Sequence, residues 1–514
     1  MADLVKPFHP TGELSVEESN QNEKMSIDTF QGKVQIQWDP QLNATTLGQL
    51  PFFVEYLKIS GLFAKWVEEC PLKYLSNNAP SKTDALGTIL LSVLSGHQRY
   101  AHISRLQNDR VNPSLLGMRK VISEDAVRRA LTKLDEEESL PWLNDQLKHC
   151  FSPLLTEPWI LDVDVTVKPL YGNQEEATVG YNPKKPGRPS QTYHSYMAAN
   201  LRLMLGVDVL SGKESQSAHS RPGLWQFLHT LPRTSWPQFI RGDCGFGNEG
   251  MIAECELEEV DYLFKLRCTK NVIRTIETLM RDGEWQNAGK GWQGCESRIQ
   301  LSGWKCSRRI VVLRRPLTPR KKTASQKNSM QKELPFDDVL APAPIYEHQV
   351  LVTSLRAEIL TVAQHYRDRA DCENNFDELK NQWGWCGFTT RDVKRCRLMA
   401  NIIALIYNWW SLYVRLSEPG KRTEAITSRP LLLEGVAVRT EHARQTEITV
   451  SSIHKKSKQI GRQCRWLTKF FKKLRHSAEQ LSSVEIWYRI LSQALIKFLR
   501  GRVLKPPPML PSGA

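Results

Sequence analysis

The stretch Y-R-D-R-A-D-C-E-N-N-F-D-E-L-K, residues 366–380, contains the side chains best suited to chemistry. We predict one helix here, on which Tyr366, Arg369, Glu373 and Lys380 fall at offsets 0, 3, 7 and 14. At about 100° per residue these positions lie within an arc of about 60°. The carboxylate can bind a divalent metal, and the other three groups can hold phosphate. Mixed charge is also common on a solvated helix face, so this stretch alone leaves both interpretations open.

Two further acids lie in the stretch L-D-V-D-V-T, which alternates as a strand does. On a strand, Asp162 and Asp164 share one face, because side chains repeat every two residues. Burying two carboxylates in an apolar strand is costly unless a cation or another partner is present. An edge strand with solvated acids is the alternative interpretation.

Asp243 supplies another acid at the end of the apolar stretch F-I-R-G-D, just before a glycine turn. Sites in α/β proteins are built at the ends of strands, although Asp before Gly is also common in ordinary turns. Two divalent metals can cut a phosphodiester bond, and such metals require oxygen ligands from several carboxylates. Asp377, one turn beyond Glu373, is a fallback ligand, whereas Glu378 lies about 140° away on the helix and is disfavoured.

The spacing Y-x2-R-x3-E-x6-K, together with acids in the order Asp, Asp, Glu, resembles the signature of DDE transposases in the insertion-sequence-four superfamily. The flanking sequence looks closest to the thirteen-eighty family, and the resemblance covers residues 159–397. It implies an α/β RNase H-like core, a mixed sheet with flanking helices, interrupted by a β-rich insertion and bounded by helical terminal regions. It also implies metal-dependent cleavage at transposon terminal repeats and cut-and-paste strand transfer into target DNA, with a DNA hairpin as one route.

The resemblance assigns roles to individual residues. The catalytic metal ligands would be Asp164, Asp243 and Glu373, binding Mg²⁺ or Mn²⁺, two ions per site. Asp164 is favoured over Asp162 because it stands two residues before Thr166 in a D-x-T pattern, and Asp162 would be the alternative ligand or a helper. The residues implied to contact DNA phosphates beside the site are Tyr366, Arg369 and Lys380.

Two other groups of residues are candidates for DNA contact. The loop G-Y-N-P-K-K-P-G-R-P-S offers Lys184, Lys185 and Arg188 to the backbone, with a solvated turn as the alternative. In relatives, a tryptophan of the insertion stacks on a base flipped out of the duplex. The candidates here are Trp285, Trp292 and Trp304, and core packing is the commoner role for any one of them.

We divide the chain into six segments. A mobile N-terminal arm (1–40) precedes a helical segment (41–150), which is either a reader of DNA ends or a plain helical bundle. The core occupies residues 151–267 and 348–392, and the β-rich insertion occupies residues 268–347. A helical, basic C-terminal region covers residues 393–514.

The positive charge is concentrated in the last quarter of the chain. The net charge is +15, while residues 391–514 hold 24 Lys and Arg against 8 Asp and Glu. This asymmetry favours a nucleic-acid partner. We expect a cytoplasmic protein, nucleoid-associated when bound to DNA, that acts as a homodimer on terminal repeats and target DNA without membrane or small-molecule partners. A non-transposing structure-specific endonuclease and an inactive DNA-binding relative are the alternatives.

Overall fold

The computed structural model describes most of the chain. The described ranges are 24–39, 41–74, 76, 78–182, 185–213, 216–317, 345–385, 387–419, 421–477 and 481–506. Lys184 of the predicted basic loop lies outside them.

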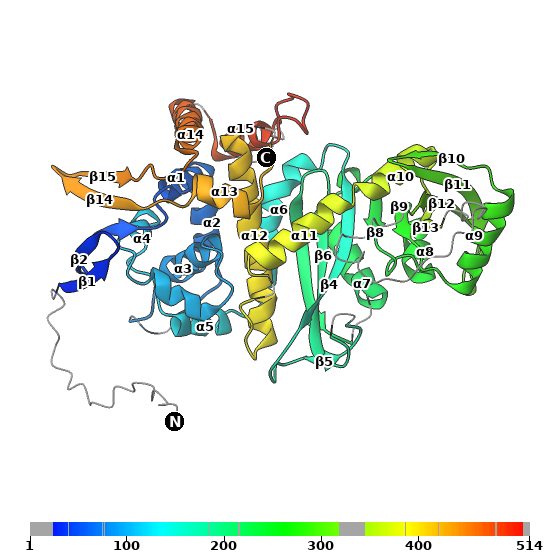
Figure 1. Ribbon diagram of the computed structural model, residues 1–514, viewed down its shortest axis with the longest axis horizontal. Coiled ribbons are helices and arrows are strands. Elements are labelled where there is room, and N and C mark those ends of the chain that lie inside the picture. The colour runs from blue at the N-terminus through cyan, green and yellow to red at the C-terminus, as the bar shows by residue number, and fades with distance from the viewer. Residues whose placement is uncertain are drawn as a thin grey trace, which may run out of the picture.

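Ten strands of the described chain form one mixed sheet, which confirms the predicted mixed sheet with flanking helices (Figure 1). Its centre is an antiparallel unit of β4 (Ile160–Pro169), β6 (Pro189–Ala198) and β7 (Leu203–Ser211). On the other side of β4, β8 (Phe239–Gly242) pairs in parallel, and β9 (Asp261–Lys265) pairs in parallel with β8. β4 therefore lies between an antiparallel and a parallel neighbour.

The segment predicted as a β-rich insertion continues this sheet beyond β9. It begins with α9 (Lys270–Asp282), and its strands run antiparallel one after another. The order outward from β9 is β13 (Tyr346–Thr353), β12 (Arg308–Pro316), β11 (Trp292–Ile299) and β10 (Gln286–Gly289). Residues 318–344 lie outside the described part of the chain. The boundaries of this segment and of the others stay predictions.

Helices cover the sheet, and two of them matter for the site. α12 (Val393–Ser417) and α6 (Glu136–Phe151) pack against β7. α11 (Ala370–Gln382) crosses the central strands, as Figure 1 shows, and the Nδ2 of Asn375 on its buried side lies 3.4 Å from the Sδ of Met197 on β6. The smaller helices α7 (Gln216–His229) and α8 (Glu249–Leu257) pack against β6 and β9.

α12 is almost wholly buried, and its two asparagines explain how a polar group is tolerated in so apolar a helix. The amide of Asn408 both accepts from Met204 N and donates to Met204 O, each at 2.8 Å. Asn401 donates to Val207 O at 3.1 Å. These bonds satisfy backbone groups on β7 that have no strand on that side. Within the described residues, no helix is both long and apolar enough to cross a membrane.

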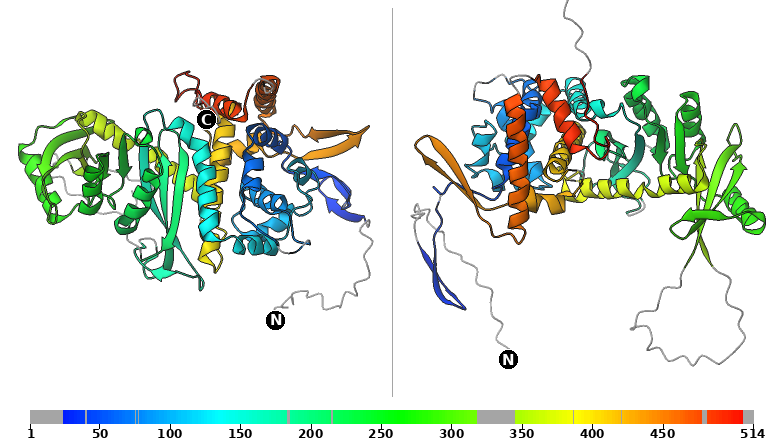
Figure 2. Two further views of the ribbon diagram at one scale, coloured as in Figure 1. Left: turned by 180° about the vertical axis from the view of Figure 1, so that it is seen from behind. Right: turned by 90° about the horizontal axis from the view of Figure 1, so that it is seen from above.

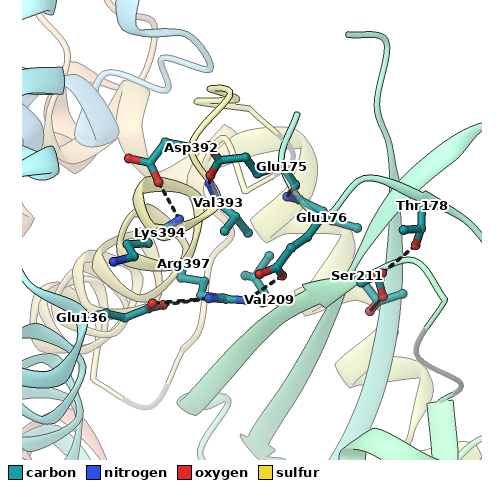
Figure 3. A network of polar contacts seen from close by, with 12 residues as sticks. Glu136, Glu175, Glu176, Thr178, Val209, Ser211, Asp392, Val393, Lys394 and Arg397 are labelled. Carbon is teal, nitrogen blue, oxygen red and sulfur yellow. Dashed lines mark hydrogen bonds and ion pairs between the residues drawn. The ribbon is translucent and has the colours of Figure 1, made fainter. Parts of the chain in front are cut away.

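Arg397 fastens the start of α12 to the core (Figure 3). Its guanidinium lies 3.1 Å from Glu136 on α6 and 2.7 Å from Glu176, and its Nε donates to Val209 O at 2.9 Å. In the same view, Thr178 of the short strand β5 (Thr178–Val179) shares a 2.6 Å hydrogen bond with Ser211. One arginine thus links a helix from the N-terminal half, the edge strand and α12.

The segment between β3 (Ala44–Thr45) and β4 is mainly helical, in the part of the chain where a helical segment (41–150) was predicted. Besides α6, its α-helices are α1 (Leu50–Ser60), α2 (Leu62–Glu68), α3 (Lys82–Leu94), α4 (Asn112–Leu115) and α5 (Glu124–Thr132). Ser123 caps α5 by accepting from Ala126 N, and two acids follow it in the first turn of the helix. Buried side chains of these helices belong to the same core cluster as α12 and the central strands. The N-terminal half is therefore packed on the core.

Two β-hairpins differ from the predicted mobile arm and helical C-terminal region. β1 (Met25–Thr29) pairs with β2 (Gly32–Ile36), where the polar sequence suggested no order. β14 (Ala437–His442) pairs with β15 (Gln445–Val450) and with β3 (Ala44–Thr45), inside the segment predicted to be helical. Both project from one end of the molecule, opposite the β10–β13 end (Figure 2). Beyond them lie α13 (Ala425–Leu432), α14 (Ser457–Ser477) and α15 (Ser483–Ala494).

Candidate active site

Asp164 and Asp243 are brought to the same level of the sheet by the pairing of β4 with β8. The parallel register places Asp162 beside Arg241, and two further residues along each strand are Asp164 and Asp243. Neighbouring strands are ~4.8 Å apart, so the two carboxylates start from adjacent positions. The negative charge of Asp243 acts on Asp164, and it raises the pKa of that group. The structure therefore unites two of the three predicted acids.

The end of β8 turns sharply and holds Asp243 in place. Oδ1 of Asp243 accepts from Gly245 N at 2.8 Å, an Asx-type turn that fixes the side chain at the strand end. A Cβ at Gly242 would lie 2.8 Å from the ring of Phe246, so only glycine fits at that position. Asn248 then caps α8 by accepting from Met251 N.

The predicted helix over residues 366–380 is two helices, and this corrects the sequence interpretation. α10 (Ile359–Arg367) ends before Asp368, and α11 begins at Ala370. At the junction the backbone hydrogen bonds span three residues instead of four, as from Arg369 N to Tyr366 O at 3.1 Å. Tyr366 therefore belongs to α10, while Glu373 belongs to α11 and Arg369 stands between them.

Arg369 links the first and third predicted acids. Its Nη2 lies 3.0 Å from Oδ1 of Asp164, and its Nη1 contacts Oε1 of Glu373. Arg369 is 6% exposed, whereas the Glu373 side chain is 59% exposed. Glu373 is therefore linked to Asp164 through Arg369, from the solvent side.

Burial and neighbouring charge set the electrostatics of this cluster. Burial, aided by Asp243, raises the pKa of Asp164 to about 6, against the lowering effects of Arg369 and Lys380. Burial also raises the pKa of Tyr366 above its usual value, with contributions from Asp243 and Glu373. Tyr366 and Lys380 therefore lie near enough to the acids to interact with them electrostatically, although they belong to two different helices.

Asp162 has a different environment from Asp164. It is 1% exposed, and its two oxygens accept from Arg241 Nε at 2.5 Å and Nη2 at 2.7 Å. Arg241 also donates to His365 O at the end of α10. Both oxygens of Asp162 thus accept hydrogen bonds from a buried cation. This ion pair has a structural role, because Arg241 connects β4, β8 and the end of α10.

The donor chemistry of the cluster fits a divalent cation. Asp164 and Asp243 offer the hard oxygens that Mg²⁺ prefers. Burial and the charge of Asp243 raise the pKa of Asp164 to about 6, and a bound cation would oppose that effect. No group of three or more His, Cys, Asp or Glu side chains in the described residues is already arranged to hold a metal. Glu373 can join the two aspartates only when it leaves Arg369.

The remaining acids of α11 lie elsewhere. Asp377 is exposed and accepts from Asn381 Nδ2 at 2.7 Å. Glu378, disfavoured by the helical wheel, is buried on the opposite side. It contacts Arg422 and accepts from Ala425 N at 2.9 Å. Glu378 is therefore a structural acid.

The predicted DNA-contacting loop forms a small cationic cluster around Tyr171. Lys185 Nζ lies 2.5 Å from its hydroxyl, and the Arg188 guanidinium lies 4.6 Å from its ring centroid. Tyr171 is 64% exposed. The loop thus presents two cations and an aromatic ring to solvent, close to the end of β4.

The three candidate tryptophans each have an arginine over one ring face. Trp292 and Trp304 are both 7% exposed and lie under Arg315 and Arg308. Trp285 is half-buried under Arg314, at 3.9 Å from its ring centroid. Among the three, Trp285 therefore retains the most accessible ring.

Arg241 is the residue of the site that the sequence interpretation missed. A signal for it existed, because an arginine in the apolar stretch F-I-R-G needs a buried partner. The partner is 79 residues away, and only the strand register reveals it. Glu249, six residues after Asp243, forms an ion pair with Arg308 of β12.

Comparison with known proteins bears on the region that holds these acids. Residues 155–409 match the family model described as a transposase DDE domain, and this span contains all three predicted acids. The match supports a DDE transposase. No curated protein matches the chain. The piggyBac transposase, solved as a synaptic complex with hairpin DNA, is 12% identical over 88% of each chain with a TM-score of 0.38, a likeness too weak to carry any argument.

Proposed function

We propose that this protein is a DNA transposase that uses Asp164, Asp243 and Glu373 for metal-dependent cleavage and strand transfer. One observation carries the proposal: Asp164 and Asp243 stand level on neighbouring strands, and Arg369 bridges Asp164 to Glu373. The transposase DDE match over residues 155–409 supports the same reaction class. Asp162 is a positioning residue in this proposal, because both of its oxygens are bonded to Arg241.

The residues of the cluster divide the work. Asp164 and Asp243, joined by Glu373, would hold Mg²⁺ or Mn²⁺, which activates the attacking hydroxyl and stabilises the leaving oxygen. Arg369, once it leaves Glu373, has a fork of donors that matches a DNA phosphate. Lys380 and the Tyr366 hydroxyl can bind the same backbone. Asp377 is the reserve acid, since it is exposed one turn beyond Glu373.

We assign the core to the RNase H-like class and the chain to the insertion-sequence-four superfamily, near its thirteen-eighty family. The strand order supports the fold, with three antiparallel strands followed by two that are parallel to the first. The spacing Y-x2-R-x3-E-x6-K supports the family. The reaction is then cut-and-paste on terminal inverted repeats and target DNA, with a DNA hairpin as the route for the second strand.

Other proposed DNA contacts come from surface residues. Lys185 and Arg188, with their neighbour Lys184, would hold the backbone beside the site. Trp285 is our choice for stacking on an unpaired base, because it is the least buried of the three tryptophans. If a base replaced Arg314 on the Trp285 ring, a cation–π contact would be exchanged for a stacking contact on the same ring face.

We propose that the protein acts as a homodimer, because cutting two DNA ends together requires two active sites. The β1–β2 hairpin supports it, because Met25, Ile27 and Val34 share one face and are 49%, 43% and 44% exposed. The opposite face of the hairpin is polar. Residues 24–39 carry two lysines and two aspartates, so this segment has no net positive charge that would attract DNA. An isolated two-stranded hairpin is marginally stable in water, so a second copy is the fitting cover.

The dimer proposal has its own test. Ile27→Glu with Val34→Glu should shift the protein from dimer to monomer in sedimentation equilibrium. Ser26→Glu with Gln35→Glu, on the polar face of the same hairpin, is the matched control and should leave the dimer intact. A wild-type monomer bound to paired DNA ends would contradict the proposal.

The function is tested with a labelled duplex that carries the element's own flanking terminal repeat, in Mg²⁺ or Mn²⁺. Cleavage at the repeat boundary should be lost in Asp164→Asn, Asp243→Asn and Glu373→Gln, while DNA binding survives. Asp282→Asn, an exposed acid at the end of α9, is the control.

Each other outcome points to a different function. Joining of a pre-cut end to target DNA separates a transposase from a structure-specific endonuclease, which would cut only. Binding without cleavage in any metal would mean a DNA-binding relative. Cleavage by the Asp164→Asn variant would move the first ligand to Asp162.

A further inference from the structure

A groove of about 880 Å³ lies between the N-terminal helices and the core, at the far end of β4. Its lining includes four arginines and no acid. Arg99 and Arg128 come from the helical segment before β4, whereas Arg391 directly precedes α12 and Arg395 lies in the first turn of α12. These residues are almost 300 positions apart in sequence, so the fold alone assembles this cationic surface.

Two of the four arginines are neutralised and two are not. Arg128 pairs with Glu124 and Asp125, and Arg395 pairs with Asp392. Arg99 and Arg391 are exposed, and neither has an ion pair within the described ranges of the chain. The groove therefore carries uncompensated positive charge on both of its walls.

The walls of the groove are held rigidly by backbone contacts. Phe388 N donates to Gln98 O at 2.7 Å, and Lys168 Nζ on β4 donates to Gly387 O at 3.0 Å. A Cβ at Gly387 would lie 2.1 Å from Gln98 O, so no side chain fits where the two walls meet. The groove is thus formed before any ligand arrives.

The backbone on either side of Arg391 is fixed by Glu175 and Asp392, which Figure 3 shows beside Val393 and Lys394. Glu175 N donates to Arg391 O at 2.9 Å, and the Glu175 carboxylate accepts from Val393 N. Asp392 caps α12 by accepting from Lys394 N at 2.9 Å. These bonds use the backbone around Arg391 and leave its guanidinium unengaged.

The groove and the candidate active site lie along one strand. Asp164 and Pro169, which lines the groove, are five residues apart on β4, which spans ~17 Å at ~3.3 Å per residue. Successive phosphates of one DNA strand advance ~3.4 Å along the helix axis, so this distance equals about five base pairs. Tyr171, which carries the Lys185 and Arg188 cluster, also lines the groove.

We propose that this groove binds the sugar-phosphate backbone of a DNA duplex, about five base pairs from the phosphate that is cut at Asp164. Arg99 and Arg391 are the phosphate ligands. The inference rests on the proposed function, and it adds a second, non-catalytic anchor that sets the cut position on the duplex. A backbone held at two points has one register along β4, whereas a backbone held at the acids alone can slide.

The test is metal-free binding of the full chain to the terminal-repeat duplex as a function of salt. Each lost phosphate contact lowers the slope of log K against log salt by about 0.9. Arg99→Ala with Arg391→Ala should therefore reduce the slope by about 2 and weaken binding about 60-fold at 0.1 M salt, with the difference vanishing toward 1 M. The matched control is Arg274→Ala with Arg281→Ala, two exposed arginines on α9 at the other end of the molecule.

Position is tested with duplexes that carry one neutral methylphosphonate each. In wild type, neutralising a phosphate four to six base pairs from the cut should weaken binding, and in the double variant it should have no further effect. The proposal would be overturned if neutralising phosphates at other positions, or at none, weakened binding by wild type but not by the double variant. It would also be overturned if the α9 control variant lost as much affinity as the double variant.

Cleavage by wild type in Mn²⁺ is measured in parallel to separate this inference from the proposed function. Cleavage by wild type, together with unchanged binding by the double variant, rejects the groove and leaves the transposase reaction standing. Coupled loss of binding without any wild-type cleavage supports the groove as a DNA site and rejects the catalytic proposal.

Discussion

Asp164→Asn should stabilise the metal-free protein relative to wild type as the pH rises from 4 to 7. The pKa of Asp164 is raised from 3.8 to about 6, first by burial and then by Asp243. Two pKa units correspond to about 3 kcal/mol of differential stability. The buried Asp164 carboxylate thus destabilises the metal-free fold at neutral pH.

The sign follows from linkage. Because the folded-state pKa is the higher one, the contribution of Asp164 to stability is fully present below pH 3.8 and is lost as the pH rises through about 6. Wild type therefore pays this loss of about 3 kcal/mol across that window, and the asparagine variant does not. The constant effect of the substitution itself cancels in the pH-dependent difference.

Urea denaturation in EDTA, followed by tryptophan fluorescence from pH 4 to 7.5, measures that difference. Asp282→Asn, an exposed acid on α9, is the matched control for the loss of one carboxylate. Adding Mg²⁺ or Mn²⁺ at pH 7 should raise the urea midpoint of wild type more than that of Asp164→Asn. A difference between wild type and Asp164→Asn that stays flat with pH, or falls as the pH rises, would refute the electrostatic account of the site.

Three further predictions concern groups buried around the site. Arg241→Met should lower the free energy of unfolding by about 3–5 kcal/mol because it leaves the buried Asp162 carboxylate without a cation. Adding Asp162→Asn to the same chain should recover part of that loss. A double variant as unstable as Arg241→Met would contradict the ion pair. Asn408→Leu should lower the free energy of unfolding, measured by urea denaturation, by about 2–4 kcal/mol, because both backbone groups of Met204 lose their partners on α12. An unchanged free energy of unfolding would show that β7 shifts to satisfy these groups in another way. Glu378→Gln should lower the thermal midpoint yet retain metal-dependent cleavage, whereas loss of cleavage in a folded variant would make this acid catalytic.

The strands that carry Asp164 and Asp243 could be predicted because each strand depends on a short-range pattern. An alternating apolar stretch predicts a strand, and a glycine turn predicts the end of one, and both acids were placed by those rules. The same alternation was present in M-S-I-D-T, where it forms β1, but its polar context hid the signal. Local periodicity thus predicted the elements that carry the acids better than it predicted the hairpins outside the core.

Features that depend on pairing between distant segments could not be predicted. The partner of Asp162 is set by the register of β4 with β8, and one residue of slip would give it another neighbour. The break between α10 and α11 has no proline or glycine to signal it, since it accompanies the contact of Arg369 with Asp164. The arginines of the groove come from opposite halves of the chain, and no spacing rule connects them.

The position of Arg369 gives the candidate site a reason to assemble only on DNA. Without a cation, this arginine supplies the positive charge that Asp164 and Glu373 share, and it does so from a position that is 6% exposed. A phosphate is the one partner present on the substrate that can compete for a guanidinium with two donors in a fork. Transfer of Arg369 to a phosphate would free Glu373 to turn toward the aspartates. The arrival of DNA and the completion of the carboxylate cluster would then be a single event, because Glu373 would join Asp164 and Asp243 only when there is a backbone to cut.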